Sequence, residues 1–169
     1  MHGSAAVAGI GESTYYKRGE SPHTEFQLAC IAIRRAVEDA GLALADIDGF
    51  VSYTDQRNIP VRLARALSLK ELRWTATPWA GGGNSMAAAV QAADAAVTAG
   101  YALHIVVFRA LAQGQFGRYG QAAGSGGGGA YMPGPFAWNG TYGILTPAHQ
   151  CALHTARFMH DYGISQEAL

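Results

Sequence analysis

The chain has 169 residues, and its 12 basic and 12 acidic side chains give a formal net charge of zero. Hydrophobic residues make up 49% and charged residues only 14%, against a usual charged share of about a quarter. Because no lysine–arginine cluster is present, the composition argues against nucleic-acid binding. We see no signal peptide and no apolar run long enough for a bilayer, so we expect a cytoplasmic protein that binds no membrane.

The first predicted elements are a strand and a helix. Residues 5–11 form a short apolar run that ends in glycine, which predicts a buried strand. A helix is expected to begin at Ser21, because this hydroxyl residue is followed by proline. Apolar residues recur at helical spacing over 26–40, and Gly41 suits the left-handed residue that ends a helix. Cys30 falls on the apolar face, so we expect it to be buried and structural.

The following elements alternate between strands and helices. Strands are predicted over 47–54 and 72–78, with a short helix opening near residue 58 between them. A long alanine-rich helix follows over 86–99. The continuous apolar run at 103–108 is rich in β-branched residues, which is typical of a strand covered on both faces. This order predicts an α/β fold with a largely parallel sheet.

The alanine-rich helix follows a turn of three glycines, residues 81–83. Its polar side chains are Gln91, Asp94 and Thr98, which share one narrow stripe. A helix that is apolar nearly all round is buried in a core or at a subunit interface. Its first turn has free N–H groups and the positive end of the helix dipole, so it can stabilise an enolate oxygen by about 3–4 kcal/mol per donor. The alternative is a tight turn without a ligand.

The amino-acid composition of the chain changes after residue 110. Residues 113–138 are rich in glycine, which indicates a functional or mobile loop. We therefore divide the chain into an α/β core, residues 1–110, and a glycine-rich loop and helical insertion, residues 111–169.

A last helix is predicted over 147–162, with Thr146 as its cap and Gly163 as its end. Ser165 then suits the cap of a further helix. Because the chain stops before that helix buries anything, we expect it to be a fragment of a longer protein or half of an assembly.

Several segments resemble the thiolase superfamily, in particular the lipid-transfer-protein branch related to the sterol carrier protein x thiolases. The resemblance covers nearly the whole chain and corresponds to the N-terminal half of such proteins. It implies a layered thiolase fold, here a βαβαβαβ half with a mixed, mostly parallel sheet and a loop-domain insertion. The resembling segments are residues 6–12, 36–53, 63–83, 108–120, 142–148 and 157–163.

One departure from the family pattern has a chemical meaning. Ordinary thiolases carry their nucleophilic cysteine at the position aligned with Gly82 or Gly83, and this chain has none there. Ser85 is nearby, but no adjacent base is visible that would activate it. A branch of the superfamily that has similarly lost the cysteine resembles retro-aldolases that cleave β-hydroxyacyl-CoA side chains during steroid degradation.

The resemblance therefore implies a retro-aldol carbon–carbon lyase that acts on a steroid or lipid β-hydroxyacyl-CoA. Its acid–base residues are expected in the C-terminal half, so no catalytic residue is assigned. The implied partners are a second copy of the chain and a small protein with an OB-like domain, with coenzyme A present only as part of the substrate. The alternatives are a non-catalytic acyl-CoA or lipid-binding homologue, or an acetyl-CoA acyltransferase, although Cys30 and Cys151 sit badly for that role.

The predicted substrate-binding residues form two groups. One group is the start of the alanine-rich helix, where backbone N–H groups can contact the thioester oxygen. The other lies in or beside the glycine-rich region, because the insertion at this place in thiolase relatives covers the acyl-CoA pocket; plain loop packing is the alternative. The residues are Gly82, Gly83, Asn84 and Ser85 in the first group, and Arg118, Tyr119 and Tyr142 in the second.

Two cofactor patterns are incomplete. Residues 9–11 follow an apolar run as in a dinucleotide fingerprint, but the third glycine is missing. On the last helix, Cys151 and His154 share a face, but two ligands do not complete a tetrahedral site. We therefore expect neither a dinucleotide nor a metal.

Overall fold

The structure is a computed structural model that describes residues 5–52, 58–78, 85–110, 112, 115, 136–144 and 146–168. The chain divides into two compact units, Met1–Phe116 and Gly117–Leu169, and each is described by itself. The first unit contains α1 (Glu25–Asp39), η1 (Leu44–Asp46), β1 (Gly49–Val51), α2 (Pro60–Ala66), β2 (Trp74–Ala76), α3 (Ser85–Thr98) and β3 (Ile105–Val107). The second contains α5 (Phe136–Gly140), α6 (Pro147–Tyr162) and η3 (Gln166–Ala168).

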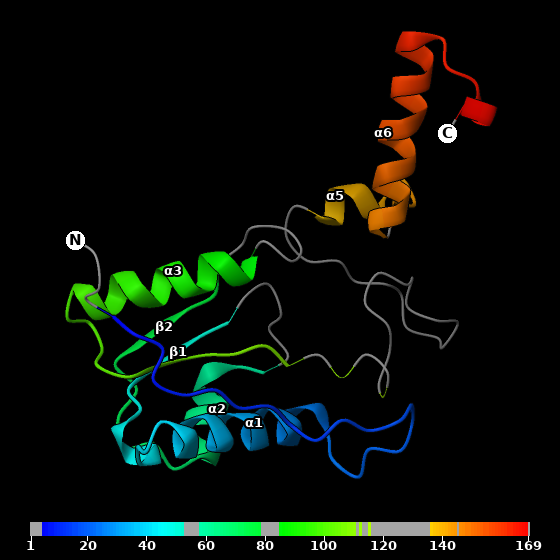
Figure 1. Cartoon of the computed structure of the whole chain (residues 1–169). Helices are drawn as coiled ribbons and strands as arrows, with labels where there is room; N and C mark the ends of the chain where they lie inside the picture. Colours follow the sequence, from blue (N-terminus) through cyan, green and yellow to red (C-terminus); the bar gives the residue numbers. More distant parts are fainter. Residues whose placement is uncertain are drawn as a thin grey trace. The chain divides into compact units, whose positions relative to one another are not determined.

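In the described part of the chain, the strands of the first unit form one parallel sheet in the order β2-β1-β3 (Figure 1). The central residue Phe50 of β1 lies opposite Thr75 of β2 and Val106 of β3. Parallel neighbours require crossover connections, and helices supply them here. The predicted α/β class is confirmed, although the strands are shorter than the sequence indicates.

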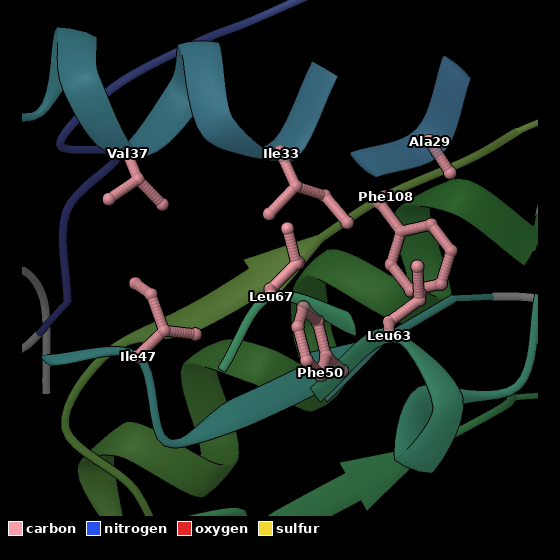
Figure 2. Packing of buried hydrophobic residues seen from close by; sticks show 8 residues of the cluster. All are labelled: Ala29, Ile33, Val37, Ile47, Phe50, Leu63, Leu67 and Phe108. Carbon is pink, nitrogen blue, oxygen red and sulfur yellow. The ribbon is translucent and has the colours of Figure 1, made fainter. Parts of the chain in front are cut away.

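Helices cover both faces of this sheet, with α1 and α2 on one side and α3 on the other (Figure 1). Successive residues of a strand point to opposite faces. Phe50 accordingly packs with α1 and α2, and its neighbour Val51 packs with α3. Figure 2 shows the larger cluster, in which side chains of α1 meet those of α2 and the sheet. Its members are Ala29, Ile33, Val37, Ile47, Phe50, Leu63, Leu67 and Phe108.

Helix α3 packs on the sheet through small residues. Ser85, Ala89, Ala93 and Ala96 are buried, and alanine side chains let the helix backbone approach the strands closely. The opposite face is open in the described chain, where Val90 is 49% exposed. The sequence predicted a helix that is buried on nearly all sides. In the described part of the first unit, α3 is buried on the face that packs on the sheet.

Helix α1 begins later than predicted. Its cap is Thr24, whose side chain accepts a hydrogen bond from the Gln27 N–H at 3.2 Å, while the Gln27 side chain accepts one from the Thr24 N–H at 2.8 Å. This reciprocal pair satisfies two free donors of the first turn. The Ser21 hydroxyl instead donates to the His23 carbonyl at 2.8 Å, so Ser21 is not the cap. Gly41 has φ +67° directly after the helix, as predicted.

The predicted strand at residues 5–11 is wrong: the structure assigns this segment to no strand. The segment lies against α1 instead, and a Cβ atom at Gly9 or Gly11 would collide with the backbone of Ala36. The Ile10 N–H donates to the Asp39 carboxylate at 2.9 Å, which holds the segment on the helix. The two glycines therefore serve a close approach to a helix, which the apolar run alone does not distinguish from a place in the sheet.

The last helix is confirmed with its ends. Thr146 caps α6 by accepting from the His149 N–H at 3.4 Å, and Gly163 ends it with φ +63°. A left-handed residue at this place is typical of glycine. The α6 helix has no buried residue in the described structure, so local capping rather than core packing defines its ends.

Candidate functional site

The candidate site is the edge of the sheet at which the three parallel strands end. Helix α3 begins at this edge, because it connects β2 to the parallel strand β3 and must run back along the sheet. The connection from β1 to β2 runs through α2 on the opposite face. In open α/β sheets, ligands bind outside the carboxyl ends of the strands, where connections diverge to the two faces.

The predicted residues at the start of α3 are described only in part. Ser85 is the first residue of the helix, and its side chain is completely buried, with 0% exposure. Gly82, Gly83 and Asn84 lie outside the described residues. Their role in binding a thioester oxygen stays a prediction.

The second predicted group belongs to the second unit. Arg118 and Tyr119 lie outside the described residues. Tyr142 is 68% exposed, and its ring lies against Trp138 with 6.0 Å between the ring centroids. No contact in the described structure assigns this exposed residue to a ligand, so its role also stays a prediction.

Cys30 does not lie at the start of α3. Cys30 lies in α1, on the opposite face of the sheet, where it packs half-buried against the larger cluster. Burial raises the pKa of the Cys30 thiol, and the nearby Arg34 guanidinium opposes this shift only partly. Cys151 is exposed on α6. A half-buried thiol with a raised pKa is a poor nucleophile because little thiolate is present near neutral pH.

A polar network that the sequence did not reveal fixes the chain where it leaves β3. The Glu25 carboxylate, at the start of α1, accepts a hydrogen bond from the Ala112 N–H at 2.9 Å and one from the Asn58 side-chain amide at 3.3 Å. The same amide donates to the Ala110 carbonyl at 3.4 Å. Asn58 is buried. The only sequence signal was an acidic residue in a first helical turn.

A second set of hydrogen bonds anchors the same part of the chain to the segment before α1. The Gln115 amide donates to the carbonyls of Tyr16 at 3.1 Å and Lys17 at 2.7 Å. Its oxygen accepts from the Ser21 N–H at 3.1 Å. The Gln115 side chain thereby joins two parts of the chain that lie about a hundred positions apart in the sequence.

The described residues contain no group of three histidine, cysteine or carboxylate side chains that can hold a metal ion. Among the helices of the described part, none combines the length and the apolar character needed to cross a bilayer. Arg109 follows β3 and is half-buried.

Comparisons with known proteins give consistent matches, although no family model matches the chain. The chain is 37% identical over 169 residues to a steroid side-chain-cleaving aldolase from Thermomonospora curvata, covering 99% of this chain and 42% of that protein. It is 34% identical over 170 residues to the 17-hydroxy-3-oxo-4-pregnene-20-carboxyl-CoA lyase of Mycobacterium tuberculosis, covering 96% of this chain and 42% of that protein.

A solved structure agrees with these sequence matches. An Ltp2–ChsH2(DUF35) aldolase superposes with a TM-score of 0.66 at 35% identity, covering 94% of this chain and 38% of the matched one. The chain thus spans about two-fifths of the length of the relatives it matches.

Proposed function

The chain belongs to the thiolase-like family of the steroid side-chain-cleaving aldolases, and from this membership we propose that it acts in a retro-aldol carbon–carbon lyase. The observation that carries the proposal is identity of 34% and 37% to two such enzymes over nearly the whole chain. The proposed substrate is a steroid or lipid β-hydroxyacyl-CoA. The complete activity belongs to the whole protein, because the chain corresponds to two-fifths of the relatives' length.

The proposed reaction needs no covalent bond to the protein. A base removes the proton of the β-hydroxyl group, the bond between the α and β carbons breaks, and the β carbon becomes a ketone. The electron pair passes to the thioester as an enolate, and protonation of its α carbon gives the shortened acyl-CoA. Backbone N–H groups at residues 82–85 are proposed to stabilise the enolate oxygen at the N-terminus of α3. This role fits a helix start that has no cysteine.

We propose a partner for this chain by analogy with the solved Ltp2–ChsH2(DUF35) aldolase. A DUF35-type protein with an OB-like domain is the proposed partner, and a second copy of the chain is proposed to complete a dimer. We also propose that the protein acts in the cytoplasm without a cofactor beyond the coenzyme A of its substrate.

The decisive test is an assay of the protein with its DUF35-type partner. The probe is 17-hydroxy-3-oxo-4-pregnene-20-carboxyl-CoA, the compound in the name of the mycobacterial relative. Release of a 17-keto steroid and propionyl-CoA, unchanged after treatment with iodoacetamide, supports the lyase. Loss of activity after that treatment would favour an acyltransferase, and tight binding without turnover would favour a non-catalytic acyl-CoA-binding homologue.

A further inference from the structure

Helix α6 has an apolar face and a polar face along its whole length. With about 100° of rotation per residue, most of its apolar side chains fall on one side of the helix and its polar side chains fall on the other. The large members of the apolar face are Phe158, Met159 and Tyr162. The rings of Phe158 and Tyr162 lie against each other, with 4.9 Å between their centroids. This arrangement is typical of a helix that packs on another element through one face.

The polar face of α6 is suited to solvent. The Arg157 Nε atom lies 2.8 Å from a carboxylate oxygen of Asp161, one turn further along, and both side chains are exposed. A charge pair at this spacing stabilises a solvated helix face. Leu153 is also on this side and is 52% exposed, but single apolar side chains on a surface are normal. The polar face is therefore satisfied by water and by its own ion pair.

The apolar face of α6 stays open, whereas that of α1 is covered. Helix α1 has 15 residues and buries its apolar stripe in the first unit, with Ile33 and Val37 among the buried side chains. Helix α6 has 16 residues and no buried one in the described structure, where Phe158 is 46% and Tyr162 71% exposed. Helices of this length are marginal in water unless an apolar face packs on something. The apolar face of α6 therefore needs a covering element.

The relatives indicate what covers this face. The match to the Thermomonospora aldolase includes 99% of this chain, and therefore α6, but only 42% of that aldolase. The solved aldolase likewise superposes on 94% of this chain with only 38% of its own. More than half of the fold of these relatives thus lies outside this chain, and it provides apolar surface that the described residues lack.

We propose that the apolar face of α6 is the docking surface for that remaining part of the aldolase fold. Phe158, Met159 and Tyr162 form the centre of the contact, and the side with Leu153 and Arg157 faces water. The inference rests on the family membership and not on the proposed reaction, so the two can fail separately.

The test uses a complete protein in which this chain replaces the matched part of the Thermomonospora aldolase. Amide hydrogen exchange of α6 is compared between this chimera and the 169-residue chain alone. We expect the α6 amides to exchange roughly tenfold more slowly or better in the chimera, because the buried aromatic side chains must be exposed before the helix opens. The amides of α1 are the internal control, since α1 already packs on the sheet in the chain alone, and their exchange should change less.

A matched pair of substitutions tests which face is covered. Phe158→Gln and Leu153→Gln each replace a half-exposed apolar side chain of α6 by a neutral residue that favours helices. In the chimera, Phe158→Gln leaves a buried amide without partners and should return the exchange of α6 towards that of the chain alone. Leu153→Gln should leave it within about twofold of the unsubstituted chimera. Equal effects of the two substitutions would overturn the assignment of the face.

Other patterns of exchange would overturn the proposal. Fast exchange of α6 in the chimera would mean that the remaining part of the fold does not cover it. Slow exchange in the monomeric 169-residue chain would mean that the chain covers its own helix. Slow exchange only in a dimer of the chain, or only after the DUF35-type partner is added, would assign the face to that partner.

Two further results are distinguished. If the chimera does not fold, the same exchange measurement is made on the complete Thermomonospora aldolase, over the segment aligned with α6 and with glutamine at the positions aligned with Phe158 and Leu153. A chimera in which α6 is protected but the steroid acyl-CoA is not cleaved would keep this inference and count against the proposed lyase function.

Discussion

Both carboxylate oxygens of Asp48 accept a hydrogen bond from the backbone N–H of Leu103, at 3.0 and 2.9 Å. One of them also accepts from the His104 N–H at 2.9 Å, and the Arg73 guanidinium lies 3.6 Å from the other. Asp48 precedes the central strand, and these partners precede the two strands beside it. A single buried carboxylate therefore ties together the starts of all three strands of the described sheet.

This arrangement predicts that Asp48→Asn lowers the free energy of unfolding by about 1–3 kcal/mol, because an amide offers one acceptor where the carboxylate satisfies several donors. Urea denaturation measures the change. Asp94→Asn, on the exposed face of α3, is the matched control and should stay within about 0.5 kcal/mol of wild type. Equal stability of the two variants would contradict the structural role of Asp48.

The segment before α1 gives a second prediction. Gly9→Ala places a methyl group against the Ala36 carbonyl and the Ala40 side chain, so the segment must move away from the helix. We expect a loss of about 1–3 kcal/mol in unfolding free energy, as for overpacking elsewhere. Limited proteolysis should also cut residues 5–16 faster. Val7→Ala is the control, since Val7 is 81% exposed and its truncation removes little contact.

Some elements of the fold follow from local sequence, whereas others depend on tertiary contacts. The cap and end of α6 follow from Thr146 and Gly163, whose effect is confined to neighbouring residues. The strand at residues 5–11 was wrongly predicted, because an apolar run does not say whether a helix or a strand lies beside it. The predicted start of α1 at Ser21 was wrong, because the reciprocal hydrogen bonds between Thr24 and Gln27 make Thr24 the cap.

The candidate site also has features that the sequence predicted and features that it did not. The family resemblance was confirmed by relatives that match nearly the whole chain, since it rested on sequence shared with them. The network of Glu25, Asn58 and Ala112 was missed, because it joins residues 33 and 87 positions apart that only the fold brings together.

The packing of α3 predicts unequal effects of the same substitution on its two faces. Ala89→Leu adds bulk where α3 meets Val51, at a position with 0% exposure, and should lower the unfolding free energy by about 1–3 kcal/mol. Ala95→Leu lies on the exposed face and should leave the stability of the first unit nearly unchanged. Denaturant titration of both variants gives the comparison, and a larger loss for Ala95→Leu would mean that the helix is turned differently.

The environments of the two cysteines predict the order of their alkylation. Cys151 is exposed, whereas burial raises the pKa of the Cys30 thiol and so reduces its thiolate fraction at any pH below that pKa. With iodoacetamide at about pH 7.5, Cys151 should react first, and the rate at Cys30 should rise as the pH approaches about 9. Mass spectrometry follows both sites, and Cys151→Ser isolates the slower one. Because the proposed cleavage forms no bond to sulfur, lyase activity should persist while either thiol is modified. Activity that declines in step with alkylation of Cys30 would instead assign the chemistry to a thiol.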